Sequence, residues 1–219
     1  KKSSIIRTFR FIELSLKFLF FLLFKVKKND KVFFVTNPAT LLIVVALVKK
    51  IKKIETILLV HDVFPENTIA ANIIRSEKSI IYKFIKYIFD WSYKQMTKII
   101  VLGRDMQKIL KSKLKDSNST VVIIENWGEN EIIYPTKMKN YDKIIFQYAG
   151  NLGRVQGLDL LVDVISQIKN ENLLFEFIGN GAQKEKLQEI VSNKKINNII
   201  FKGSYTRLQQ NDILNGCHI

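Results

Sequence analysis

The sequence predicts an α/β fold built from doubly wound parallel sheets in two domains. From Lys31 onward, apolar runs of strand length alternate with longer helix-like segments. The strand-like runs are rich in Ile, Val, Leu and Phe and show little alternation of apolar and polar residues, as expected when both faces of a parallel sheet are covered. This pattern is typical of an open architecture that binds ligands at the carboxyl ends of its strands.

The first predicted element is a helix at residues 11–26, FIELSLKFLFFLLFKV. Only Phe18 to Phe24 is free of polar side chains, and a bilayer span takes about 20 apolar residues. No small-residue cleavage site follows, so a secretory signal is not expected. Two interpretations stay open: a helix in the core, or a helix in a membrane interface. In the second, the cations near the lipid head groups would be Arg7, Arg10, Lys17, Lys25, Lys27 and Lys28.

Seven strands and six further helices follow in alternation. The short runs rich in Ile, Val, Leu or Phe predict strands at residues 31–36, 55–62, 98–103, 120–127, 143–150, 173–180 and 198–203. The segments between them predict helices at residues 39–53, 78–96, 104–115, 157–169, 182–193 and 206–215.

The domain boundary is expected at residues 128–142, where apolar periodicity lapses around Pro135. Residues 1–127 then form the first domain and residues 143–219 the second. The chain begins with Lys1, and Cys217-His218-Ile219 resembles the opening of a buried strand. We therefore expect both ends to be truncated and both domains to be incomplete.

The composition places most of the positive charge in the first domain. The chain has 219 residues, 47% apolar and 25% charged, which excludes a disordered protein. The net charge is +15, and residues 141–219 hold nine basic and eight acidic residues, so residues 1–140 carry +14. This asymmetry suggests an anionic partner for the first domain, either a lipid surface or a nucleic acid. Biased codon usage that merely adds solvating lysines is the alternative.

Several classes of function are set aside by missing residues. Cys217 is the single cysteine, which excludes an intramolecular disulfide and a Cys-rich metal site and indicates the cytoplasm. The histidines are His61 and His218, and the sequence has no Ser nucleophile elbow, HExxH, EF-hand loop or CxxC. Metal catalysis on His or Cys ligands is therefore not expected. The 15 Phe residues lie mostly inside apolar runs and are expected in the core.

The first candidate site is HDVFPEN, residues 61–67, directly after the strand ETILLV. A His-Asp pair at the carboxyl end of a strand is where an α/β enzyme places a polar catalytic group. Pro65 fixes the turn and restricts Phe64 to extended backbone. The alternative is structural: Asp62 or Asn67 caps the next helix and His61 makes a structural hydrogen bond.

The second candidate site is YAGNLGRVQG, residues 148–157. Glycines at 150, 153 and 157 let backbone amides approach an anion, and Arg154 can make a forked bond to a phosphate. A nucleotide diphosphate fits this pattern, although the spacing is neither a Walker A sequence nor GxGxxG, and a plain tight turn is the alternative. Glycines at 179, 181 and 203 follow later strands, and glycine at successive strand ends predicts one continuous crevice.

In these segments the sequence resembles a bacterial family 4 glycosyltransferase of the GT-B fold, of the branch found in O-antigen, capsule and colanic-acid assembly. HDVFPEN resembles the branch's polar-Asp-x-aromatic-Pro-Glu segment, VLGRDMQKIL its strand and Gly-initiated helix, and IIENW the end of its first domain. FQYAGNLGRVQGLDLLVDVI, FEFIGNGAQKEKLQEI and NIIFKGSYTRLQQNDIL resemble the first three strand–helix units of its donor domain.

The resemblance implies a role for each candidate residue. His61 would lie against the donor sugar near the reacting centre, beside Asp62 of the same motif, and Arg154 would stabilise the leaving diphosphate. The other donor-binding residues would be Gly150, Asn151, Gly153, Gln156, Gly179, Asn180, Gly181, Gly203 and Ser204. Many relatives have Arg and Lys where this chain has Asn151 and Gln156, which leaves Arg154 as the loop's cation.

The resemblance further implies a retaining hexosyltransferase that uses a nucleotide sugar, expected to be UDP-linked, and an acceptor glycan on polyprenyl diphosphate. The protein would lie on the anionic inner face of the plasma membrane, where residues 1–53 offer 13 basic and two acidic residues. No cofactor or metal is expected, since the chain lacks the Asp-x-Asp pair of metal-dependent transferases. The family's Gly-rich acceptor loop and its E-x7-E glutamates are absent, so this stretch alone is expected to be inactive.

Two other functions stay open. One is a related GT-B enzyme that acts on nucleotide sugars without a glycan acceptor, such as an epimerase. The other is a non-catalytic basic module that binds nucleic acid with strong salt dependence. The sequence has no recognised nucleic-acid motif, and its basic residues surround an apolar helix in place of exposed aromatics. We therefore expect no nucleic-acid partner.

Overall fold

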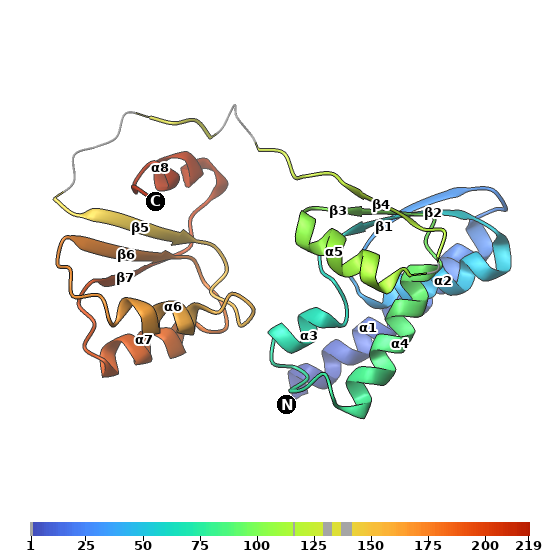
Figure 1. The fold of residues 1–219 in the computed structure, drawn as a ribbon, viewed down its shortest axis with the longest axis horizontal. Coiled ribbons are helices and arrows are strands. Elements are labelled where there is room, and N and C mark those ends of the chain that lie inside the picture. The colour runs from blue at the N-terminus through green and yellow to red at the C-terminus, as the bar shows by residue number, and fades with distance from the viewer. Residues whose placement is uncertain (1, 116, 129–132, 137–141) are drawn as a thin grey trace. The chain divides into compact units, whose positions relative to one another are not determined.

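The computed structural model describes residues 2–115, 117–128, 133–136 and 142–219 (Figure 1). These residues fall into two compact units, the first ending at Asn126 and the second beginning at Trp127. Most of the predicted linker at residues 128–142 lies outside the described residues. Each unit is an α/β layer structure with its own parallel sheet and its own core.

The first unit contains a four-stranded parallel sheet in the order β1-β2-β3-β4. The strands are β1 (Lys31–Val35), β2 (Glu55–Val60), β3 (Lys98–Val101) and β4 (Thr120–Ile123). The register aligns Val60 with Val101 and Val101 with Ile123, so the carboxyl ends of these strands lie at one edge. That edge carries the segment that follows β2.

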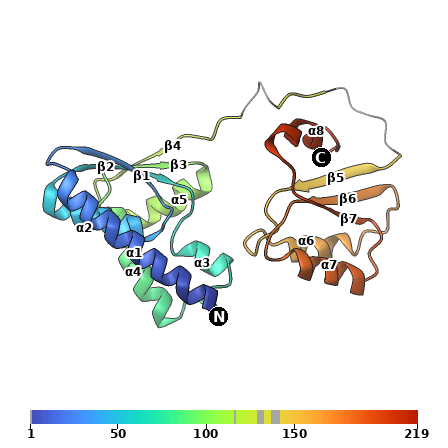
Figure 2. The same cartoon turned by 180° about the vertical axis from the view of Figure 1, so that it is seen from behind.

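Five helices accompany this sheet: α1 (Lys2–Lys25), α2 (Thr40–Lys52), α3 (Glu66–Ala70), α4 (Ile80–Lys94) and α5 (Arg104–Lys113). Figures 1 and 2 show them on one side of the strands. Parallel strands that follow one another in a single direction place right-handed crossover helices on the same face. Burial along β2 therefore alternates, with Thr56, Leu58 and Val60 buried and their neighbours half-buried, although the residue types do not alternate.

The second unit contains a three-stranded parallel sheet in the order β5-β6-β7. The strands are β5 (Ile144–Ala149), β6 (Leu173–Ile178) and β7 (Ile199–Lys202). The helices α6 (Leu158–Ile165) and α7 (Lys184–Asn193) cover one face, and a 3₁₀ turn, η1 (Arg207–Gln209), leads into α8 (Gln210–Leu214). The buried core of this unit contains Leu152, Val162, Phe177 and Leu187.

Apart from shifts of up to four residues at helix ends, the helix predictions differ from the structure in three places. The first helix begins at Lys2, ahead of the predicted Phe11, because the preceding residues continue an amphipathic helix. The helix α3 was not predicted, since five residues are too short for a helical period to show in the sequence. The helix predicted over residues 206–215 is a 3₁₀ turn followed by a short α-helix.

The end of the chain lies beside β5. The amide N–H of His218 donates to the carbonyl of Ile145, and that of Gln147 donates to the carbonyl of Ile219. The imidazole Nδ1 of His218 also accepts from the amide N–H of Ile145 at 3.0 Å. The residues predicted to open a strand are therefore hydrogen-bonded along the free edge of this sheet.

Candidate functional site

The segment that follows β2 is held at its start by one buried hydroxyl. Thr36, directly after β1, is 2% exposed, and its Oγ1 accepts from the amide N–H groups of His61 at 3.0 Å and Asp62 at 3.2 Å. The His61 and Asp62 residues themselves are exposed. Among the described residues, no hydrogen bond to the His61 imidazole is found. An exposed imidazole and an exposed carboxylate thus lie together at the carboxyl edge of the first sheet.

The capping interpretation of this segment is wrong. The residue before α3 is Pro65, and no side chain caps the helix, so neither Asp62 nor Asn67 serves that purpose. Glu66 opens the helix and points its carboxylate toward two lysines, with its Oε1 2.6 Å from Nζ of Lys113 and 3.4 Å from Nζ of Lys86. The polar residues of HDVFPEN therefore divide into an exposed pair and a charge held inside the unit.

A buried network of charges lies behind that segment. The Lys113 side chain is 1% exposed, and its Nζ is 2.6 Å from Oε1 of Glu66 and 2.6 Å from Oδ1 of Asp90. Lys86 contacts the other oxygen of Asp90 at 2.7 Å. Burial lowers the pKa of Lys113, and the hydrogen bonds with Asp90 and Glu66 oppose that shift. This network was not predicted, because Lys113 lies in a Lys-rich run that is typical of a solvated surface.

In the second unit, the loop after β5 and the loop after β6 are joined by backbone hydrogen bonds. The amide of Gly150 donates to the carbonyl of Ile178, that of Leu152 to the carbonyl of Asn180, and that of Gln183 to the carbonyl of Leu152, each at 2.9 Å. Both loops lie at the carboxyl ends of their strands, since Ala149 is aligned with Ile178 in the register. The predicted residues of these two loops are therefore brought together.

Two glycines allow this close approach. Gly179 has a φ of +136°, and a Cβ atom built on it would lie 1.9 Å from the carbonyl oxygen of Gly150. A Cβ atom on Gly181 would lie 2.4 Å from the carbonyl group of Leu152. Neither position can hold a side chain without separating the loops. Gly203 differs, because a Cβ atom there would meet open space.

Polar side chains cluster on the joined loops. Nδ2 of Asn180 donates to Oγ of Ser204 at 2.6 Å, and Nζ of Lys184 donates to Oδ1 of Asn180 at 2.9 Å. The side-chain amides of Asn151 and Gln156 lie over Gly153, at 2.8 and 2.7 Å from where its Cβ atom would be. Lys184 was missed in the sequence because it opens a helix without belonging to any glycine pattern.

The cluster is suited to an anion. Arg154 is exposed in the same loop, and in the described part of the chain it makes no salt bridge. Gly157 then precedes α6 with a φ of +62°. Lys184 adds a second cation at the start of α7. Two cations beside tightly turned backbone and helix N-termini provide charge-assisted donors for a phosphate.

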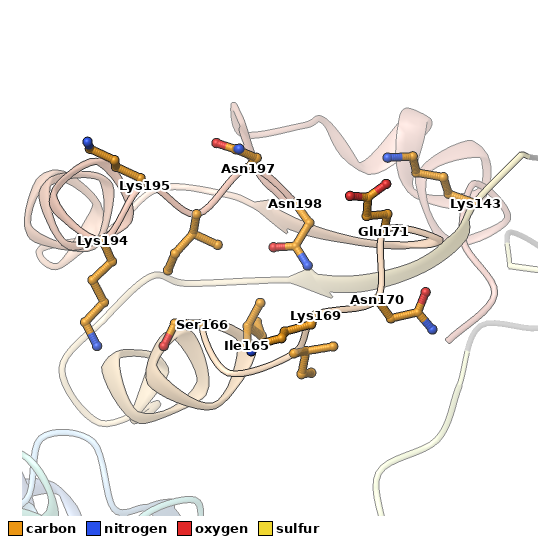
Figure 3. Close-up of a pocket in the computed structure, with 12 residues that line it drawn as sticks. Lys143, Ile165, Ser166, Lys169, Asn170, Glu171, Lys194, Lys195, Asn197 and Asn198 are labelled. Atoms are coloured by element: carbon orange, nitrogen blue, oxygen red, sulfur yellow. The ribbon is translucent and has the colours of Figure 1, made fainter.

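A separate cavity lies at the opposite end of the second sheet (Figure 3). It has a volume of about 450 Å³, and Lys143, Lys169, Lys194 and Lys195 are among the residues that line it. Figure 3 shows the lysines pointing in different directions, and Lys194 is paired with Asp163 at 2.6 Å. The cavity has positive charge but no convergent set of donors, and no residue of the predicted site lines it.

One face of α1 packs against the core of the first unit, and the other face is exposed. Leu22 is buried against the core of the first unit, and Oγ of Ser15 is 2.6 Å from Oγ1 of Thr40 on α2. The opposite face exposes apolar side chains, of which Phe9, Phe20, Phe21 and Phe24 are the largest. No helix in the described residues combines the length and the apolar character that a membrane crossing needs. The core interpretation is confirmed for the face that carries Leu22, and the membrane-interface interpretation stays a prediction for the exposed face.

The chain is similar to known glycosyltransferases. Residues 130–219 match the family described as glycosyl transferases group 1. The chain is 31% identical over 204 residues to the probable glycosyltransferase WbjE of Pseudomonas aeruginosa, covering 89% of this chain and 50% of that protein. It is 29% identical over 132 residues to the putative colanic acid biosynthesis glycosyl transferase WcaI of Escherichia coli K12, covering 52% of this chain and 31% of WcaI.

Solved structures with the same fold include three glycosyl-transferring proteins. Sucrose-phosphate synthase from Thermosynechococcus elongatus matches with a TM-score of 0.66 at 12% identity, covering 86% of this chain and 48% of that one. TarM matches with a TM-score of 0.63 at 17% identity, and the match covers 91% of this chain and 38% of TarM. HepE of Anabaena, in complex with UDP and glucose, matches with a TM-score of 0.58 at 12% identity, and the match covers 86% of this chain and 50% of HepE. The fold is that of the GT-B enzymes, and the chain spans half the length of the Pseudomonas relative.

Proposed function

Since this chain carries a glycosyl transferases group 1 domain at residues 130–219, we propose that the full-length protein transfers a hexosyl group from a nucleotide sugar to a glycan. The observation that carries the proposal is the pair of joined loops after β5 and β6, with Arg154 and Lys184 beside them. A nucleotide diphosphate presents the charge that such a cluster can bind. UDP is the first candidate, because HepE and GtfA, which share the fold, are complexes with UDP.

The proposed chemistry needs charge stabilisation more than a protein nucleophile. The bond between the sugar carbon and the diphosphate oxygen breaks, a bond to the acceptor oxygen forms, and negative charge develops on the leaving diphosphate, which takes up the proton that the acceptor hydroxyl releases. Arg154 would stabilise that charge with its forked donors, without a metal cofactor. The resemblance to family 4 implies that His61 and Asp62 contact the donor sugar and that the anomeric configuration is retained.

Removing the guanidinium of Arg154 tests the donor site. We expect Arg154→Ala to weaken UDP binding by about 10- to 150-fold, because a charge-assisted hydrogen bond contributes about 1.5–3 kcal/mol. Thermal unfolding of the full-length protein against UDP measures the change, and Arg104→Ala, an exposed Arg at the start of α5, is the control. Equal UDP binding by Arg154→Ala and the unchanged protein would contradict the assignment.

We further propose that the protein works on the inner face of the plasma membrane, with a polyprenyl-diphosphate-linked glycan as acceptor. The support is the exposed face of α1, where Phe20 and Phe24 stack at 6.3 Å between ring centroids and Lys17 and Lys25 are exposed nearby. Each basic residue close to an anionic surface contributes about 1 kcal/mol, and exposed Phe side chains add apolar contact. The WcaI relative is named for colanic acid biosynthesis, which agrees with a cell-surface glycan as product.

Vesicle sedimentation tests the membrane proposal. The protein is expected to pellet with anionic vesicles at low salt and less at high salt. The double variant Phe20→Ser/Phe24→Ser keeps the charge of the unchanged protein but removes the apolar contact of the two rings. We therefore expect it to remain in solution. Leu160→Ser/Val164→Ser removes two exposed apolar side chains of α6 and should pellet as the unchanged protein does. Equal pelleting with neutral and anionic vesicles would count against the proposal.

A further inference from the structure

We propose that Lys113 is a positioning residue that fixes the segment of residues 61–66, and with it the exposed pair His61 and Asp62. This inference rests on the proposed transferase function, in which that pair contacts the donor sugar. Lys113 itself is buried inside the first unit, so it acts through the residues that it holds.

The start of the segment is fixed by Thr36. Its hydroxyl oxygen accepts from both the His61 and the Asp62 amides, and the residue is buried at the end of the neighbouring strand. This contact fixes the backbone at residues 61 and 62 against β1. It leaves the remainder of the segment to be held from the other end.

The far end of the segment is held by groups around Lys113. The amide N–H of Phe64 donates to the Tyr93 hydroxyl oxygen at 3.2 Å, and the ring of Tyr93 lies under Nζ of Lys113 at 5.8 Å from its centroid. The Phe64 ring stacks on Phe89 at 5.5 Å between centroids. Glu66 closes the segment through its contact with Lys113. One ammonium group therefore contacts both the aromatic ring and the carboxylate that hold residues 64–66.

The carboxylate of Glu66 depends on the lysines for its position. Both Lys113 and Lys86 contact its Oε1, and Oε2 is buried without a hydrogen-bond partner among the described residues. Asp90 completes the arrangement from α4, so the ammonium of Lys113 ties together α3, α4 and α5. In the part of the chain that the structure describes, no further ion pair of the Glu66 side chain is found.

A buried lysine with two carboxylates is not the simplest way to stabilise a core. Apolar residues of similar volume often replace such groups without loss of stability, so a charged cluster is better explained by a need for defined geometry. Reacting groups must be held within a fraction of an ångström, and a misplacement of about 1 Å can reduce a rate about 100-fold. His61 and Asp62 are exposed and need their backbone to supply that precision.

The first experiment compares kcat with the donor KM at a temperature well below unfolding. Lys113→Met in the full-length protein is expected to lower kcat about 10- to 100-fold. The donor KM should stay within about twofold, because Arg154 and the joined loops belong to the other unit. Lys111→Met removes an exposed lysine from the same helix and is expected to leave both constants unchanged. A folded Lys113→Met protein with the original kcat would overturn the inference.

A compensated variant separates positioning from stability. Lys113→Met/Glu66→Gln/Asp90→Asn removes the charges together, so no carboxylate is left buried without its cation. We expect its unfolding midpoint to recover toward that of the unchanged protein while kcat stays low. Recovery of kcat together with stability would show that the network serves stability alone.

Amide hydrogen exchange gives a readout that does not need transfer activity. In Lys113→Met/Glu66→Gln/Asp90→Asn, whose stability is expected to recover, exchange of the His61, Asp62 and Phe64 amides is expected to quicken, while the β3 amide of Ile99 keeps its rate. Unchanged exchange across residues 61–66 would overturn the positioning role even if no sugar transfer is found. Quickened exchange in a protein whose unchanged form transfers no sugar would refute the proposed function and retain the structural link.

Discussion

Replacing Lys113 with Met is expected to lower the free energy of unfolding by about 3 kcal/mol, the largest effect of any single charge in the first unit. The loss arises because Glu66 and Asp90 would keep their negative charges without the ammonium 2.6 Å from each. Their side chains are 27% and 23% exposed, so water relieves part of the penalty and keeps the loss at the lower end of the range for broken buried pairs.

Denaturant unfolding of Lys113→Met beside Lys111→Met measures this loss. The control removes a lysine of the same helix whose side chain is exposed, and surface changes of that kind stay within about 0.5 kcal/mol. A Lys113→Met protein as stable as its control would mean that the buried charges contribute nothing to folding.

Replacing Gly179 with Ala is expected to cost about 2–3 kcal/mol and to abolish UDP binding. Its φ of +136° is strained for any residue with a Cβ atom, and such strain costs about 1–3 kcal/mol. The Cβ atom would also lie 1.9 Å from the carbonyl oxygen of Gly150, so the two loops would have to separate. The hydrogen bond from the Gly150 amide to Ile178 would then be lost, together with the geometry of the donor site.

Gly103→Ala is the matched control, because it makes the same change just after β3 of the first unit, where a Cβ atom meets open space. Thermal unfolding with and without UDP measures both variants. If Gly179→Ala and Gly103→Ala behaved alike, the close contact between the loops would not be what organises the site.

The strands were predictable because their signal is local. Each of the seven predicted strands overlaps an observed strand, and each observed strand ends one to four residues before the predicted end. Several of the residues beyond the observed ends, such as His61 and Gly150, belong to the loops that carry the candidate site. Apolar runs identify a strand, but its last hydrogen bond depends on the neighbouring strand and cannot be found in the run itself.

The residues of the candidate site were predictable only where a glycine follows a predicted strand. Gly150, Gly179 and Gly181 were identified from their place at strand ends. In the structure all three lie where the loops after β5 and β6 contact each other. Lys184 and Lys113 belong to no comparable sequence pattern. Lys113 meets Asp90 and Glu66 across 23 and 47 residues of sequence, and only the packing of three helices brings their charges together.

Hydrogen exchange of the full-length protein with and without UDP tests the central claim most directly. If the joined loops bind a nucleotide diphosphate, UDP should slow exchange at residues 150–157, 179–184 and 203–205, and the effect should persist at high salt. The basic cavity at the other end of the sheet provides the internal comparison. Slowed exchange confined to residues 166–172 and 194–198, or no slowing anywhere in the second unit, would contradict the assignment of the donor site.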